Sequence, residues 1–151
     1  MADTLFAVLI QIQGDALLLP NAAVSEVTAM DRFENAESRA PGWLAGWHTT
    51  AERRIPVLSF ESLCGRPRPE NQKRQRVVIV NPVGQRVHGG AFALLAQGHP
   101  HLLTLKREAI AAIDLRVNDR HEMILSRVRV AGQEAVIPDL ERIETELAGL
   151  A

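Results

Sequence analysis

The chain alternates short apolar runs with polar or glycine-containing turns, and most of these runs have the length of a β-strand. Thr4 to Pro20 contains two apolar runs around Gly14-Asp15, a pair that supplies the positive φ of a tight turn, so two strands and a hairpin are predicted there. Residues 31–40 are polar without a period and predict a loop. Further strands are predicted at residues 24–30, 43–48, 53–58, 77–80, 87–96, 102–105, 109–117, 123–130 and 135–137, with a bulge or bend at Gly89-Gly90.

Two helices complete this pattern. Ser59 to Cys64 predicts a helical turn that is capped by Ser59 and ended by Gly65. From Pro138 onward, apolar residues recur at helical spacing, so the chain is predicted to end in an amphipathic helix. Many short strands with one closing helix predict a mainly β protein of small barrels, and a basic connector near the midpoint suggests two of them.

Pro56 adds one expectation about the surface. Because proline lacks a backbone donor, we expect it at a sheet edge or a bulge rather than in the middle of a ladder. An exposed edge beside apolar side chains would be a docking surface.

Composition narrows the class of protein. A chain of 151 residues, 46% hydrophobic and 23% charged, is typical of one soluble globular domain. Its net charge of −1 gives no global field that would gather nucleic acid or an anionic membrane. Cys64 is the single cysteine, so no intramolecular disulfide can form, and its apolar neighbours predict a buried, unreactive thiol. No apolar stretch reaches the roughly 18 residues of a spanning helix, and we expect a cytoplasmic protein.

One histidine pair could carry metal chemistry. His99 and His101 are two residues apart, so in a strand both imidazoles would face one side and could share a metal, with His88, Asp114 or His121 as a third ligand. No further metal-binding spacing accompanies the pair, and two exposed loop histidines are the simpler interpretation. A small metal-dependent hydrolase that uses His99 and His101 remains an alternative, although no catalytic motif is visible.

Two other features admit two interpretations each. The basic connector from Arg66 to Arg76 is a solvated linker or, as an alternative, the RNA-binding surface of a β-barrel, but it lacks the interleaved aromatics on which bases stack. Trp43 and Trp47 either fill a core or include one exposed interface anchor.

A family resemblance rests on two blocks of sequence. Gly14 to Pro20 is a glycine turn leading to a proline-ended strand, and Val24, Glu26 and Val27 follow as V-x-E-V. Gly46 lies ten positions before Pro56, in an apolar hairpin. These features, in this order, resemble the chemotaxis coupling proteins, the CheW-like adaptors. Residues 77–80 and 92–95 resemble the paired strands of that family's second barrel.

The resemblance implies a fold and a function. The expected fold has two five-stranded SH3-like barrels packed on a shared hydrophobic core, with a C-terminal helix. Residues 1–151 would form a single CheW-like domain, with subdomains at about residues 15–75 and 76–137. The implied function is a non-enzymatic adaptor, without cofactor or metal, that couples methyl-accepting chemoreceptors to the regulatory domain of a chemotaxis-type histidine kinase. Neither nucleic-acid binding nor membrane insertion is expected.

The resemblance also implies partner-binding residues. A receptor-facing groove would be lined by one strand and one turn, and a second strand would meet the kinase; the residues are Val24, Glu26, Val27, then Thr49, Thr50, Ala51, and finally Ile55 and Val57. The family's N-L-R-G is here Thr49-Thr50-Ala51-Glu52, so alanine stands at the arginine position. Because alanine cannot imitate a guanidinium, any contact that relied on that arginine should be lost or rewritten. We therefore expect a divergent coupling protein, of the accessory kind found in chemosensory systems that control type IV pili and twitching motility.

Overall fold

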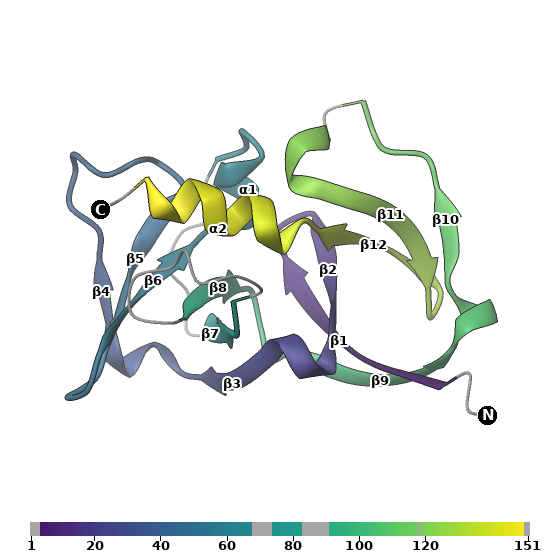
Figure 1. The fold of residues 1–151 in the computed structure, drawn as a ribbon, viewed down its shortest axis with the longest axis horizontal. Coiled ribbons are helices and arrows are strands. Elements are labelled where there is room, and N and C mark those ends of the chain that lie inside the picture. Colours follow the sequence, from purple (N-terminus) through teal and green to yellow (C-terminus); the bar gives the residue numbers. More distant parts are fainter. Residues whose placement is uncertain (1–3, 68–73, 83–90, 118, 150–151) are drawn as a thin grey trace.

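The computed structural model describes residues 4–67, 74–82, 91–117 and 119–149, and it is mainly β (Figure 1). Its strands form two six-stranded sheets. The terminal sheet has the order β10-β11-β12-β2-β1-β9, and the central sheet has the order β3-β7-β8-β6-β5-β4. The strands of the terminal sheet are β1 (Thr4–Ile12), β2 (Asp15–Pro20), β9 (His101–Lys106), β10 (Ala111–Ile113), β11 (Ile124–Val130) and β12 (Gln133–Pro138). Those of the central sheet are β3 (Val24–Thr28), β4 (Phe33–Asn35), β5 (Leu44–Thr49), β6 (Arg54–Leu58), β7 (Arg76–Val80) and β8 (Phe92–Ala96).

Each sheet encloses its own apolar interior, and a third cluster lies between the sheets. Ala7, Leu9 and Leu18 belong to the interior of the terminal sheet, whereas their neighbours Val8, Ile10 and others belong to the shared core. Successive side chains of a strand point to opposite faces, so a strand between two cores must be apolar on both. This explains the nearly continuous apolar runs of β1, β2, β7 and β8, and it confirms two barrels on a shared core.

The two halves of the chain exchange strand pairs. Apart from one further 3-10 turn, which lies at a different place in each half, the halves have the same order of elements: an antiparallel pair, a strand, a 3-10 turn, a short strand, a second antiparallel pair and a helix. The pair β1–β2 from the first half lies between β9 and β12 of the second half, and β7–β8 lies between β3 and β6. Each exchange creates one parallel contact, β12 with β2 and β6 with β8. Each sheet is therefore built from strands of both halves of the chain.

Several local expectations are confirmed and others need correction. Gly14 has φ 76° in the turn between β1 and β2, as predicted. The segment expected as a loop at residues 31–40 contains the short strand β4, which forms one edge of the central sheet. The strand expected over residues 109–117 is confined to Ala111–Ile113. Residues 87–90, with the expected bend at Gly89-Gly90, lie outside the described residues.

Pro56 is not on an edge strand, because β6 lies between β8 and β5. Only Val57 and Leu58 of β6 pair with β8, and Pro56 precedes this short ladder. Pro56 therefore lies outside the ladder with β8, and its missing N–H removes no hydrogen bond from that ladder.

The 3-10 turns η1 (Asn21–Ala23), η2 (Met30–Arg32), η3 (Arg107–Ala109) and η4 (His121–Met123) lie between strands, and two α-helices follow β6 and β12. Helix α1 (Phe60–Leu63) is capped by Ser59, which accepts a hydrogen bond from the backbone of Ser62, as predicted. Helix α2 (Leu140–Ala148) is capped by Asp139 and buries Ile143 and Leu147 in the shared core. Figure 1 shows α2 running from the end of β12 back toward β5 and β6. Within the described residues, no helix has the length and apolar character needed to span a bilayer.

A buried ion cluster connects the exchanged pair β1–β2 to β11. The side chain of Arg127 is 1% exposed and donates two hydrogen bonds to each of two carboxylates, those of Asp15 and Asp119. The donor–acceptor distances are 2.7 and 3.1 Å to Asp15 and 2.8 Å, twice, to Asp119. The hydrogen bonds from the guanidinium to Asp119 and Asp15 raise the pKa of Arg127, against the opposing effect of burial. This cluster fixes the exchanged pair in the sheet of the other half.

Candidate functional site

A charged groove lies between β3 and the turn of the β5–β6 hairpin, and we call it the hairpin groove. It has a volume of about 380 Å³. Its lining contains four of the residues expected to bind partners, namely Glu26, Thr50, Ala51 and Ile55. The remaining lining residues are Arg32, His48, Glu52, Arg53 and Ile79. Tertiary structure thus brings together half of a set of residues that is divided over two distant sequence blocks.

The other expected residues lie beside the groove. Val24 and Val27 of β3 are half-buried against the shared core. Thr49 is half-buried at the end of β5, and its hydroxyl has no hydrogen-bond partner among the described residues. Val57 is completely buried in the interior of the central sheet. Val57 therefore supports the hairpin from inside and presents no surface to a partner.

Thr50 holds the turn that forms one wall of the groove. Its backbone N–H donates to the carbonyl of Arg53 at 2.9 Å, and its hydroxyl donates to the same carbonyl at 3.2 Å. The hydroxyl also accepts from the N–H groups of Arg53 and Glu52, at 3.2 and 3.4 Å. No residue of this turn has a positive φ. The threonine side chain therefore stabilises a turn in which Glu52 replaces glycine without backbone strain.

The groove contains charges that have no ionic partner. Within the described part of the chain, the side chains of Glu26, Arg32, Glu52 and Arg53 make no ion pair and no hydrogen bond. His48 is 4% exposed, and its Nδ1 has no hydrogen-bond partner among the described residues. Unpaired charges at the surface are solvated in the free protein and available to a charged partner. The groove therefore presents both carboxylates and guanidinium groups at its surface.

Gly46 of β5 allows the neighbouring strand β4 to approach closely. A Cβ at this position would lie 2.6 Å from the ring of Phe33 and would also contact the carbonyl oxygen of Glu34. Both residues belong to β4, which pairs with β5 at Gly46. Glycine is therefore required here for the close approach of β4, and this is the physical reason for the glycine that precedes Pro56 by ten positions.

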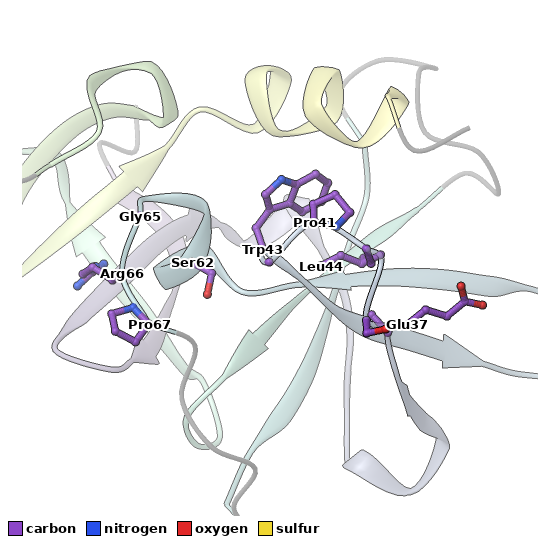
Figure 2. Close-up of a pocket in the computed structure, with 12 residues that line it drawn as sticks. Glu37, Pro41, Trp43, Leu44, Ser62, Gly65, Arg66 and Pro67 are labelled. Atoms are coloured by element: carbon purple, nitrogen blue, oxygen red, sulfur yellow. The ribbon is translucent and has the colours of Figure 1, made fainter.

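The two tryptophans have different roles. Trp43 packs partly against the shared core. It also lines a second hollow, of about 550 Å³, between the β4–β5 connection and the end of α1. Figure 2 shows Pro41, Trp43 and Leu44 on one side of this hollow and Ser62, Arg66 and Pro67 on the other. Trp47 is half-buried on β5, and the guanidinium carbon of Arg54 lies 4.2 Å from its ring centroid.

An exposed apolar pair lies on the terminal sheet and was missed by the sequence analysis. Phe6 of β1 is 59% exposed and Leu102 of β9 is 64% exposed. The register pairs Phe6 with Thr104 and Val8 with Leu102, so Phe6 and Leu102 are diagonal neighbours on the face that carries Val8. Both strands are apolar along most of their length, so the sequence does not distinguish the apolar residues that are buried from those that are exposed.

The structure places the histidines and the cysteine that were candidates for metal or thiol chemistry. His99 and His101 are both exposed, and only His101 lies in β9. Within the described residues, no three His, Cys, Asp or Glu side chains are grouped to hold a metal; His88 lies outside them. Burial raises the pKa of Cys64 to about 11, against the lowering effect of Arg66 and Arg120. The central part of the basic connector, residues 68–73, also lies outside the described residues.

Comparison with known proteins gives one family and one fold. Residues 7–147 match the family model described as the CheW-like domain. The structure is similar to the crystal structure of the scaffolding protein TtCheW from Thermoanaerobacter tengcongensis, with a TM-score of 0.71 and 16% sequence identity. That similarity covers 90% of this chain and 89% of the other. No curated protein matches the sequence.

Proposed function

Because the chain belongs to the CheW-like domain family, we propose that it is an adaptor that couples methyl-accepting chemoreceptors to a chemotaxis-type histidine kinase in the cytoplasm. The adaptor catalyses no reaction and needs no cofactor, since its task is to hold two proteins together. The observation that supports this function most directly is the hairpin groove, where Glu26, Thr50, Ala51 and Ile55 meet.

The receptor contact is assigned to β3 and the turn of the hairpin. Glu26 is exposed and unpaired within the described part of the chain, so it can form an ion pair without first breaking one. Val24 and Val27 flank it and offer apolar surface that is already partly packed on the shared core. Thr50 fixes the turn on the opposite wall, which reduces the entropy that is lost when a partner binds.

The kinase contact is assigned to the β5–β6 hairpin. Ile55 lines the groove but is only 1% exposed, and it is buried with Val57 in the interior of the central sheet. The outer side of the hairpin carries the stacked pair of Trp47 and Arg54, a type of side-chain pair that is frequent at the centre of protein interfaces. The regulatory domain of the kinase would meet this outer side, while the buried residues keep the hairpin rigid.

The substitutions in the turn support a changed partner. Ala51 stands where the family pattern has arginine, and the unpaired cations nearest to it in the groove are Arg32 and Arg53. Cationic contacts in this protein would therefore come from other strand and turn positions than the family pattern indicates. We assign the protein to the accessory adaptors of chemosensory systems that control type IV pili and twitching motility.

A binding experiment tests this function. Purified protein is titrated with the regulatory domain of a chemotaxis-type kinase and, separately, with a receptor signalling tip. Glu26→Lys should weaken at least one of these complexes by about tenfold, because it reverses the charge of a residue that lines the groove. The matched control is Asp114→Lys, which reverses the charge of an exposed residue in the C-terminal half of the chain. This variant should bind both partners as the wild type does.

Two results would contradict the proposal. If folded wild-type protein captures neither partner, the adaptor function is wrong. If a folded Glu26→Lys variant binds both partners with wild-type affinity, the hairpin groove is not the contact site. Circular dichroism establishes the folded state, since a surface substitution of this kind should change stability by no more than about 0.5 kcal/mol.

A further inference from the structure

Strand β9 occupies in the terminal sheet the place that β3 occupies in the central sheet. Each is the outermost strand of its sheet, each is followed by a 3-10 turn, and each pairs with the first strand of an exchanged pair. Both strands lie along the same side of the molecule in Figure 1. If β3 belongs to a docking surface, its counterpart β9 is the next surface to consider.

The register places apolar residues of the two strands on corresponding faces. Val27 of β3 pairs with Val78, and Leu102 of β9 pairs with Val8. Val78 and Val8 are both buried in the shared core, so Val27 and Leu102 both lie on the face of their sheet that is turned toward that core. Val27 is half-buried there, whereas Leu102 is 64% exposed, and the exposed ring of Phe6 is its diagonal neighbour. The β9 side therefore presents more apolar surface than the β3 side.

The two strands differ in charge. The charged residue of β3 is the carboxylate of Glu26. Strand β9 carries exposed Lys106 and no carboxylate, and the turn after it carries exposed Arg107 and Glu108, so this edge has one more cation than carboxylates. An acidic partner is therefore favoured at β9 and disfavoured beside Glu26 of β3.

The outer edge of β9 is open. Among the described residues, β9 forms a backbone ladder with β1 on one side only. The backbone N–H and C=O groups on its other side are thus available, as they are at the exposed sheet edges to which extended peptides add a further strand.

We propose that the outer edge of β9 is a further docking surface, separate from the hairpin groove and from the outer side of the β5–β6 hairpin, and that it binds an extended acidic segment of a partner protein by strand addition. The partner's backbone pairs with β9, its apolar side chains cover Leu102 and reach Phe6, and its carboxylates meet Lys106 and Arg107. The inference rests on the proposed adaptor function, because an adaptor that holds receptor and kinase can bind a further segment only on a surface that those two contacts leave free. It deepens that function by adding a third contact, which selects its partner by negative charge.

The test uses the full chain and a capped synthetic peptide that alternates glutamate and valine, followed by amide chemical shifts. The expected result is binding that shifts the amide signals of β9 and that Lys106→Glu or Leu102→Ser weakens by about tenfold or more. A lysine–valine peptide of the same length should bind much more weakly. Glu26→Lys should leave peptide binding unchanged while it weakens the kinase or receptor complex.

The outcomes separate this inference from the proposed function. No binding of the acidic peptide, equal binding of the lysine peptide, or wild-type binding by both β9 variants would overturn the β9 surface, whatever happens at the hairpin groove. Peptide binding at β9 in a protein that captures neither kinase nor receptor would leave the β9 surface standing and reject the adaptor function. Both variants change exposed side chains, so a folded protein is expected in each case.

Discussion

Replacement of Arg127 by methionine should be among the most damaging single substitutions in this protein. The guanidinium is 1% exposed and makes four hydrogen bonds to the carboxylates of Asp15 and Asp119. Methionine keeps much of the apolar stem but removes every donor. Two carboxylates, with side chains 2% and 8% exposed, would then remain in the protein without their main cation.

The magnitude follows from these contacts. Hydrogen bonds to ionised groups contribute about 1.5–3 kcal/mol each when considered singly, but the desolvation of three charges offsets much of that sum. Removing one member of a buried ion pair costs about 3–5 kcal/mol, because the other member is left buried and unpaired. We expect the same loss here, and for a domain of this size it corresponds to a fall in Tm of about 6–20 °C.

Urea unfolding measures the effect. Trp47 lies in β5 of the central sheet, and Trp43 directly precedes that strand. Their fluorescence therefore reports whether damage in the terminal sheet lowers the stability of the whole domain. The matched control is Arg129→Met on the same strand, since Arg129 is 62% exposed and its one ion pair has a separation of 3.9 Å. The control should stay within about 0.5 kcal/mol of the wild type. If Arg127→Met also costs less than about 1 kcal/mol, the assignment of the cluster as a stabilising connection is refuted.

Three further predictions concern single positions. Gly46→Ala should destabilise the protein by about 1–3 kcal/mol in the same urea assay, because the new Cβ overlaps β4, whereas Gly42→Ala meets no atom within 4 Å and should cost far less. Cys64 should react slowly with a thiol reagent at neutral pH and quickly once the protein is unfolded, since burial raises its pKa to about 11; fast labelling of the folded protein would contradict this. Burial acts to raise the pKa of Asp119, but the hydrogen bonds from Arg127 and from a backbone N–H outweigh it and lower that pKa. The stability that Asp119 adds is therefore present above the pKa of the unfolded carboxyl, about 3.9, and is lost as the pH falls through the pKa of the folded one. Comparison of wild type with Asp119→Asn across that acid range checks the sign, and a difference that grows in acid would contradict it.

Local features of the fold were readable from the sequence where backbone preference decides them. Gly14 gave the first hairpin because its turn needs a positive φ, and Ser59 gave the start of α1 because a hydroxyl can satisfy a free N–H group. Helix α2 was visible as a helical period of apolar residues. Strand β4 was missed, since three residues are too few to show an alternation and Glu34 and Asn35 are exposed.

The candidate site was only partly predictable. Family resemblance brought Glu26 and the Thr49–Ala51 turn into one hypothesis, and the structure places Glu26, Thr50 and Ala51 on one groove. The resemblance could not show that Val57 is completely buried. Strand β6 has apolar residues on both faces, because Val57 faces the interior of the central sheet and Leu58 the shared core, so the sequence does not distinguish a buried residue from an exposed one. The exposed pair of Phe6 and Leu102 was hidden for the same reason.

The sequence by itself determined most of the strand segments, the turn of the first hairpin, and the positions where two helices begin. These properties depend on neighbours in the chain, through dihedral preferences and the two periodicities of side chains. Only the tertiary structure decided that each half of the chain contributes a strand pair to the sheet of the other, and that Asp15 contacts Arg127 over a separation of 112 residues. It also decided that, among the described residues, β9 pairs with a neighbouring strand on one side only. Strand partners are chosen by long-range packing and hydrogen bonding, and those choices leave no periodic trace in the sequence.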